Sequence, residues 1–200
     1  METFWNAGNP GRSAGFGDGV RLRVLGGDAE ADWPLWREAR ISALREAPEA
    51  FVVRLADWAA GEGERWRARL TLPGAHNVVA VRGGRPVGLA RGVPAGPGVV
   101  ELRSVWVGAR ERGRGLGDAL LAEIAGWALG VGARELRLAL VPGNERALAL
   151  YRRHGFAVVA DDSAERADGE RADGERPAGS GRPGEDARGM VLMSRPLGRA

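Results

Sequence analysis

The chain is 200 residues long, enough for one domain with a sizeable core, and its formal net charge is only +3. It has no cysteine and only two histidines, His76 and His154, which excludes disulfides, thiol nucleophiles and thiolate metal sites, so we expect no metal. Its arginines are not interleaved with aromatic residues, and no apolar run reaches the roughly 18–20 residues of a membrane span, so we expect no nucleic-acid or membrane partner and a cytoplasmic location.

The beginning of the chain is poor in apolar side chains. Residues 1–19 cannot bury enough apolar surface to order themselves, and we expect them to form a flexible tail. Residues 20–25 alternate between apolar and charged side chains, which predicts a strand. We place one domain at residues 20–197.

Two helices are predicted next. Asp32 and Pro34 mark the start of a helix that continues to about Glu46 and is stopped by Pro48. Its predicted inner face consists of apolar residues at helical spacing: Trp36, Ala39, Ala43, Leu44 and Ala47. A weaker helix is expected within residues 55–70.

Three tryptophans occur in this helical region. Trp36, Trp58 and Trp66 either pack the two helices together or line a substrate pocket. Beyond them, residues 77–82 and 85–93 are expected to form a hairpin, because two consecutive glycines separate these apolar segments.

The second half of the chain alternates strands with helices. Residues 99–107 are rich in β-branched and large apolar side chains, as in a mostly buried strand, and a helix is expected from residue 116. A strand at 136–140 follows. Asn144 then stands where the N-cap of another helix belongs, and residues 156–159 predict a further strand.

An acidic repeat interrupts the C-terminal region. Residues 161–188 carry nine acidic side chains and five arginines, a net charge of −4, and the pentapeptide ERADG occurs twice in succession at 165–174. A period of five without an apolar face is not a solenoid repeat. We therefore expect a disordered insertion before the last strand, which is predicted at residues 190–193.

Three glycines alternate with other residues directly before the helix that starts at residue 116. The loop reads Arg112, Gly113, Arg114, Gly115, Leu116, Gly117. Glycines let backbone N–H groups approach a ligand at the electropositive end of a helix, which predicts an anion-binding loop. Neither common nucleotide motif fits, because the dinucleotide fingerprint needs glycine where Leu120 stands, and the P-loop needs a lysine, which this chain lacks.

The spacing of Arg112, Gly115 and Gly117 resembles the R/Q-x-x-G-x-G/A motif of the GCN5-related N-acetyltransferases, the GNAT superfamily. A second segment resembles the family's N-x-x-A-x-x-x-Y-x-x-x-G-F pattern. The matching residues are Asn144, Ala147, Tyr151, Gly155 and Phe156. The resemblance implies an α/β fold: a single GNAT-type domain whose mixed, mostly antiparallel central sheet is flanked by helices.

In this family the loop amides hold the pyrophosphate of acetyl-CoA, so the resemblance implies acetyl-CoA as a cosubstrate. The cofactor-binding residues that it implies are Val105, Val107, Arg112, Gly113, Arg114, Gly115, Leu116, Gly117 and Asn144. The strand edge at Val105 and Val107 would pair with the pantetheine arm, and an N–H near Val107 would stabilise the oxyanion. Asn144 either reaches the cofactor or only caps its helix.

Two residues are candidates for catalysis. Tyr151 matches the family tyrosine that protonates the CoA sulfur; otherwise it is a packing residue of an amphipathic helix. Glu101 lies eleven residues before Arg112, an interval similar to that of the strand glutamate that some family members use as a base. The alternative for Glu101 is an ion pair with Arg103 or another arginine.

We expect an acyltransferase that moves an acetyl group from acetyl-CoA to a primary amine by direct transfer in a ternary complex. The acceptor is an amine-bearing small molecule or a protein amine, and a homodimer is left open. Two alternatives remain: an acyl-CoA-binding module without turnover, and an Arg/Gly-rich nucleic-acid-binding domain. CoA release in the presence of an amine would distinguish the enzyme from the binding module. Steeply salt-dependent binding of RNA or DNA would favour the nucleic-acid-binding domain.

Overall fold

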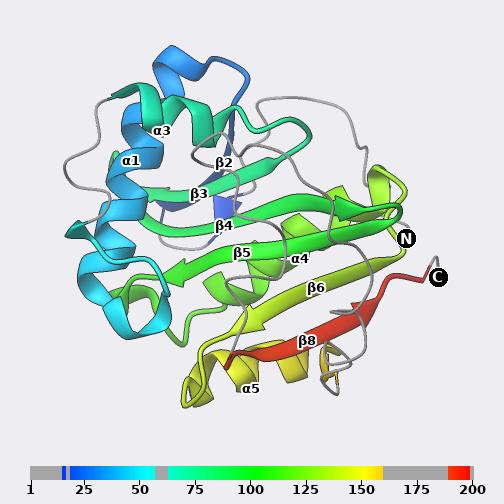
Figure 1. The fold of residues 1–200 in the computed structure, drawn as a ribbon. Helices are drawn as coiled ribbons and strands as arrows, with labels where there is room; N and C mark the ends of the chain where they lie inside the picture. The colour runs from blue at the N-terminus through cyan, green and yellow to red at the C-terminus, as the bar shows by residue number, and fades with distance from the viewer. Residues whose placement is uncertain (1–14, 17–18, 57–62, 160–188, 199–200) are drawn as a thin grey trace, which may run out of the picture.

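The computed structural model describes residues 15–16, 19–56, 63–159 and 189–198 (Figure 1). The described strands form one sheet in the order β1-β2-β3-β4-β5-β6-β8-β7. They are β1 (Gly15–Phe16), β2 (Val20–Leu25), β3 (His76–Arg82), β4 (Arg85–Gly96), β5 (Val99–Val107), β6 (Glu135–Leu140), β7 (Ala157–Val158) and β8 (Val191–Pro196). Neighbouring strands are antiparallel except for β5 and β6, which confirms the predicted mixed, mostly antiparallel sheet.

Helices cover both faces of the sheet. In Figure 1, α1 (Ala29–Glu46) and α3 (Gly63–Leu70) lie in front of the sheet, while α4 (Leu116–Gly130) and α5 (Glu145–Arg153) lie behind it. Each face has its own hydrophobic core. Trp36 and Trp66 are buried in the front core, which confirms the packing interpretation for these two tryptophans, and Leu120 and Ile124 are fully buried in the rear core. Trp58 lies outside the described residues. No described helix is both long and apolar enough to cross a bilayer.

The start of α1 differs from the sequence prediction. The helix begins at Ala29 because the side chain of Asp28 accepts hydrogen bonds from the backbone N–H groups of Glu30 and Ala31. Asp32, which we had predicted near the helix start, is buried inside the first turns and accepts from the Gly26 N–H at 2.9 Å. Pro34 lies within the helix rather than at its first position. The sequence prediction missed Asp28, four residues before Asp32, as the N-cap of this helix.

The predicted hairpin is confirmed. β3 and β4 pair antiparallel and are joined by Gly83 and Gly84, which have φ values of 54° and 82°. A two-residue turn with positive φ at both positions matches the right-handed twist of the strands, and only glycine adopts that conformation without strain.

Both ends of the predicted domain carry strands. Within residues 1–19, where we expected only a flexible tail, Gly15–Phe16 form β1 on the edge of β2. β7 and β8 pair antiparallel with each other, so the predicted insertion at residues 161–188 lies in the chain between two strands that are neighbours in the sheet. The insertion itself lies outside the described residues.

Candidate active site

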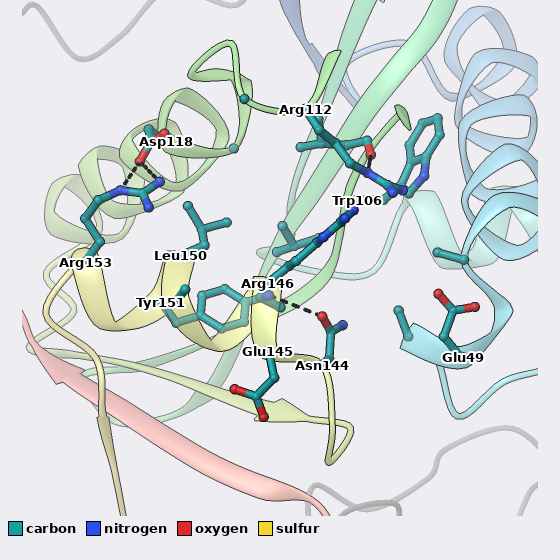
Figure 2. A pocket seen from close by; sticks show the side chains of 18 of the residues that line it. Glu49, Trp106, Arg112, Asp118, Asn144, Glu145, Arg146, Leu150, Tyr151 and Arg153 are labelled. Carbon is teal, nitrogen blue, oxygen red and sulfur yellow. Dashed lines mark hydrogen bonds and ion pairs between the residues drawn. The ribbon is translucent and has the colours of Figure 1, made fainter. Parts of the chain in front are cut away.

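The only parallel pair in the described sheet separates partway along its length. β5 and β6 are paired only through Val99–Glu135, Val100–Leu136 and Glu101–Arg137. Beyond this point each strand continues without the other, and a cavity of about 1300 Å³ opens between their carboxyl ends (Figure 2). Loops after β5 and β6 and the chain after α1 complete its walls.

The cavity brings together most of the residues that the sequence singled out. Those that line it are Val105, Val107, Arg112, Gly113, Gly115, Gly117, Asn144 and Tyr151. Glu101, Arg114 and Leu116 are not among the lining residues. Leu116 is instead buried in the rear core, at 5% exposure.

The glycine-rich loop has the geometry of an anion cradle. Gly113 and Gly115 have φ values of 75° and 81°, and a Cβ added at either position would meet no protein atom within 4 Å. Gly115 is the N-cap of α4, and no side chain caps the helix there. The first N–H groups of a helix have no intrahelical acceptor, so α4 presents free donors and the positive end of its dipole at the cavity wall. These features suit a pyrophosphate.

Gly117 has a different role. A Cβ at this position would lie 3.2 Å from a terminal carbon of Leu150, which places the first turn of α4 directly against α5. The helix that carries the anion cradle and the helix that carries Tyr151 are therefore closely packed.

The Arg112 side chain braces the cavity wall. Its Nε donates to the carbonyl oxygen of Val107 at 2.9 Å, and its Nη2 donates to Glu46 at 2.8 Å. The same Glu46 oxygen accepts from the backbone N–H of Ala109 at 2.6 Å. Arg112 thus connects the end of α1 to the end of β5, and Glu46 is a site residue that the sequence analysis missed, because its partner lies 66 positions away.

Tyr151 is buried in the wall of the cavity (Figure 2). It is 7% exposed, and its ring packs edge-on against Phe156 with 5.7 Å between centroids. Burial raises the pKa of the phenol above its ordinary value, so the hydroxyl keeps its proton at any physiological pH. Asn144, at the start of the same helix, accepts a hydrogen bond from the Ala147 N–H at 3.2 Å, which confirms that it is the N-cap. Asn144 also lines the cavity.

Glu101 lies upstream of the cavity, on the face of the sheet that packs against α1 and α3. Its carboxylate accepts from Arg103 Nη2 at 2.6 Å, so the ion pair considered in the sequence analysis is present. The side chain is 25% exposed. The structure therefore groups Tyr151 with the anion cradle but places Glu101 apart from both.

A second brace joins α4 to α5. Asp118, in the first turn of α4, accepts from Arg153 at 2.7 Å (Figure 2). Its carboxylate also lies 2.8 Å from His154 Nε2. Partial burial acts to raise the pKa of Asp118, but the hydrogen bonds and charges of His154 and Arg153 outweigh it and lower the pKa. No local pattern indicates this contact, since Arg153 and His154 lie 35 and 36 positions after Asp118 in the chain.

The family model described as Acetyltransferase (GNAT) family matches residues 35–156, more than half of the chain. The chain belongs to the GNAT family. It is thus an acyltransferase of the class that uses acetyl-CoA or another acyl-CoA, and the matched segment contains both the anion cradle and Tyr151.

Solved structures agree with this assignment. A GCN5-related N-acetyltransferase from Kribbella flavida is 27% identical, with 88% of this chain and 98% of that chain covered and a TM-score of 0.58. A GNAT acetyltransferase from Streptococcus pneumoniae shares the fold at 19% identity, with 88% and 99% covered and a TM-score of 0.58. Tetrahymena GCN5 shares it at 14% identity, with 88% and 96% covered and a TM-score of 0.57. No curated protein sequence matches the chain.

Proposed function

We propose that this GNAT enzyme transfers an acetyl group from acetyl-CoA directly to a primary amine, with both substrates bound at once. The observation that carries the proposal is the cavity between β5 and β6, which joins an uncapped helix N-terminus with left-handed glycines to a buried, protonated phenol. The first feature suits a pyrophosphate, and the second suits a thiolate that must gain a proton. The absence of cysteine supports a reducing compartment, and we place the enzyme in the cytoplasm.

The cradle and the strand edge would hold the cosubstrate. Backbone N–H groups of residues 113–117 bind the pyrophosphate, and the free edge of β5 at Val105 and Val107 pairs with the pantetheine arm. Acetyl-CoA supplies an activated acyl carbon as a thioester. An N–H at the end of β5, near Val107, donates to the oxygen that becomes negative as the amine attacks. Asn144 contributes to the wall as well as capping α5.

Proton transfers complete the reaction. The acceptor ammonium loses one proton so that its nitrogen can bond to the acyl carbon. As the C–S bond breaks, the nitrogen loses a second proton and the sulfur gains one. We assign the transfer to sulfur to Tyr151, the ionisable residue of α5 that is buried beside the cradle. We assign the removal of the first proton to Glu101, which reaches the acceptor from the α1 and α3 face and must release or share Arg103 to do so.

A screen for free thiol tests the proposal. Purified protein is mixed with acetyl-CoA and a panel of amines, and CoA release is recorded together with the mass of the acetylated amine. The proposal predicts amine-dependent release and velocity patterns of a ternary complex. Tight acetyl-CoA binding without turnover across the panel would instead support a binding module. Affinity for RNA or DNA that falls steeply with salt would support the nucleic-acid alternative.

A further inference from the structure

Four arginines from four elements meet on the front face of the sheet. This arginine cluster consists of Arg40 on α1, Arg69 on α3, Arg91 on β4 and Arg103 on β5. Arg91 and Arg103 are direct cross-strand partners and therefore point to the same face. The Arg91 side chain also donates to the backbone carbonyl of Arg69. Like charges directly opposite each other destabilise a sheet, so the arrangement calls for a compensating anion.

The structure supplies only part of that compensation. Arg103 is paired with Glu101, but the described residues offer no carboxylate partner to Arg40 or Arg91. Arg91 is only 5% exposed, and its Nε has no hydrogen-bond partner. Arg40 Nη1 is likewise buried without a partner. Buried guanidinium donors without acceptors are costly, and a bound anion would supply the acceptors that these two side chains lack.

Aromatic rings contact these two guanidinium groups. The Arg40 guanidinium lies 4.6 Å from the centre of the Phe51 ring, and that of Arg91 lies 5.8 Å from the Trp36 ring. Both contacts fall within the range of cation–π attraction. Asn77, the cross-strand partner of Arg91 on β3, is neutral and uses its amide to donate to the Leu70 carbonyl. These neighbours position Arg40 and Arg91 but carry no negative charge.

The positive charges are close enough to repel one another. Burial, together with the charges of Arg69, Arg103 and Arg40, lowers the pKa of Arg91 to about 10. Burial and the charge of Arg69 lower the pKa of Arg40 to about 10 as well. Both side chains remain charged at neutral pH, so the cluster is a fixed positive site.

The cluster adjoins the proposed active site at two points. Phe51, on which Arg40 rests, lines the cavity. Glu101, the proposed base, is bound to Arg103. In Figure 1, α1 passes in front of one end of β3 and β4, α3 lies beside α1, and neither helix covers the middle of β5. An acceptor that approaches this part of β5 would meet one carboxylate and several guanidinium groups.

We propose that the arginine cluster binds an anionic group of the acceptor, so that the preferred acceptors carry a carboxylate or a phosphate in addition to their amine. The inference rests on the proposed amine transfer and specifies its substrate class. Guanidinium groups bind both kinds of anion through paired N–H donors. The amine of the same molecule is then directed toward Glu101, where it replaces Arg103 as the cationic partner.

Matched acceptors test this inference. Amino acids are compared with their carboxamides, and phosphoethanolamine with ethanolamine, in the thiol-release assay. The charged member of a pair is expected to have a kcat/KM about 10- to 100-fold higher, the scale of one charge-assisted hydrogen bond. Whichever pair shows the larger ratio identifies the anion as carboxylate or phosphate. Equal rates within both pairs would overturn the inference.

Two variants locate the effect. Arg91→Gln and Arg40→Gln each remove one charge. Each should raise the KM for the charged acceptor about tenfold or more and leave the KM for the neutral acceptor nearly unchanged. Arg91→Lys keeps the charge and should restore part of the preference for the charged acceptor. Arg21→Gln, which removes an exposed arginine on β2, is the matched control and should change neither value. Thermal melting checks the folding of each variant, and the Arg40 variant carries the test if the buried Arg91 variant does not fold. A KM for the charged acceptor that is unchanged in folded Arg40→Gln and Arg91→Gln would refute the cluster as the anion site.

Failure of the proposed function gives a different result. If no amine is acetylated, binding of inorganic phosphate to the protein without acetyl-CoA still tests the cluster, measured by calorimetry in wild type and in Arg40→Gln. Phosphate binding that the substitution abolishes would keep the anion site while rejecting amine transfer. No phosphate binding to the wild-type protein would reject the site too.

Discussion

Gly115→Ala tests the anion cradle most sharply, because the chain contains a matched control. Gly115 has φ 81° with no protein atom within 4 Å of an added Cβ, and Gly132, at the other end of α4, has φ 80° with equally open surroundings. A left-handed conformation costs an alanine about 1–2 kcal/mol relative to glycine. Both variants should therefore lose similar stability, which corresponds to about 2–4 °C of melting temperature per kcal/mol in a chain of this size.

The two variants should differ in acetyl-CoA binding. Gly115 lines the cavity where the pyrophosphate is expected, and a Cβ there would meet no protein atom, so a new methyl group would compete with the ligand for this space. Displacing one backbone N–H from a phosphate removes a charge-assisted hydrogen bond of about 1.5–3 kcal/mol. Affinity should fall about 10- to 150-fold at Gly115 and stay unchanged at Gly132. Isothermal titration calorimetry with CoA and acetyl-CoA measures both.

The comparison has a clear negative outcome. If folded Gly115→Ala binds acetyl-CoA as tightly as Gly132→Ala does, the loop before α4 is not the pyrophosphate site. Equal losses of affinity in both variants would mean that backbone strain in α4, and not the cradle, limits binding.

Three further predictions concern single side chains. Tyr151→Phe should bind acetyl-CoA normally while kcat falls about 10²-fold. The loss of kcat should be smaller for thioesters whose leaving thiol is more acidic. A normal kcat, in an assay where chemistry limits the rate, would refute the assignment of Tyr151 as the acid. Asp118→Asn should lower the melting temperature at neutral pH, and the difference from wild type should vanish in acid. The pKa of Asp118 is lower in the folded than in the unfolded protein, so its carboxylate stabilises the fold above the unfolded pKa of about 4, and this stabilisation is lost as the pH falls through the folded pKa. A difference that persists at pH 2 would contradict this. Leu120→Ala removes a fully buried side chain of the rear core and should cost about 2–5 kcal/mol in denaturant unfolding, whereas a loss under 1 kcal/mol would mean that the core closes around the gap.

Local patterns predicted most of the elements. The hairpin at Gly83 and Gly84, the N-cap at Asn144 and the strand at residues 99–107 each depend on contacts within a few positions, and the structure places them as expected. The resemblance to the GNAT motifs also placed the cradle and Tyr151 together, because the motif residues lie on segments whose order the family fold dictates.

Contacts between distant segments were not predictable. Glu46 reaches Arg112 across 66 positions, and the arginine cluster assembles from four elements that no sequence window contains. The register of β4 against β5 places Arg91 opposite Arg103, and a shift of one residue would turn one of them to the other face. The ion pair of Glu101 with Arg103 is a local contact between residues two positions apart; it was one of the two alternatives in the sequence analysis, and the structure shows that it forms.

A single-turnover experiment tests direct transfer most directly. Excess enzyme is mixed with acetyl-labelled acetyl-CoA, with and without an amine identified by the screen, and samples are quenched on the millisecond scale and separated into protein, CoA and amine. Direct transfer predicts that label moves from CoA to the amine without passing through the protein. Labelled protein that forms without the amine, and then passes its label to the amine at the rate of turnover, would contradict direct transfer.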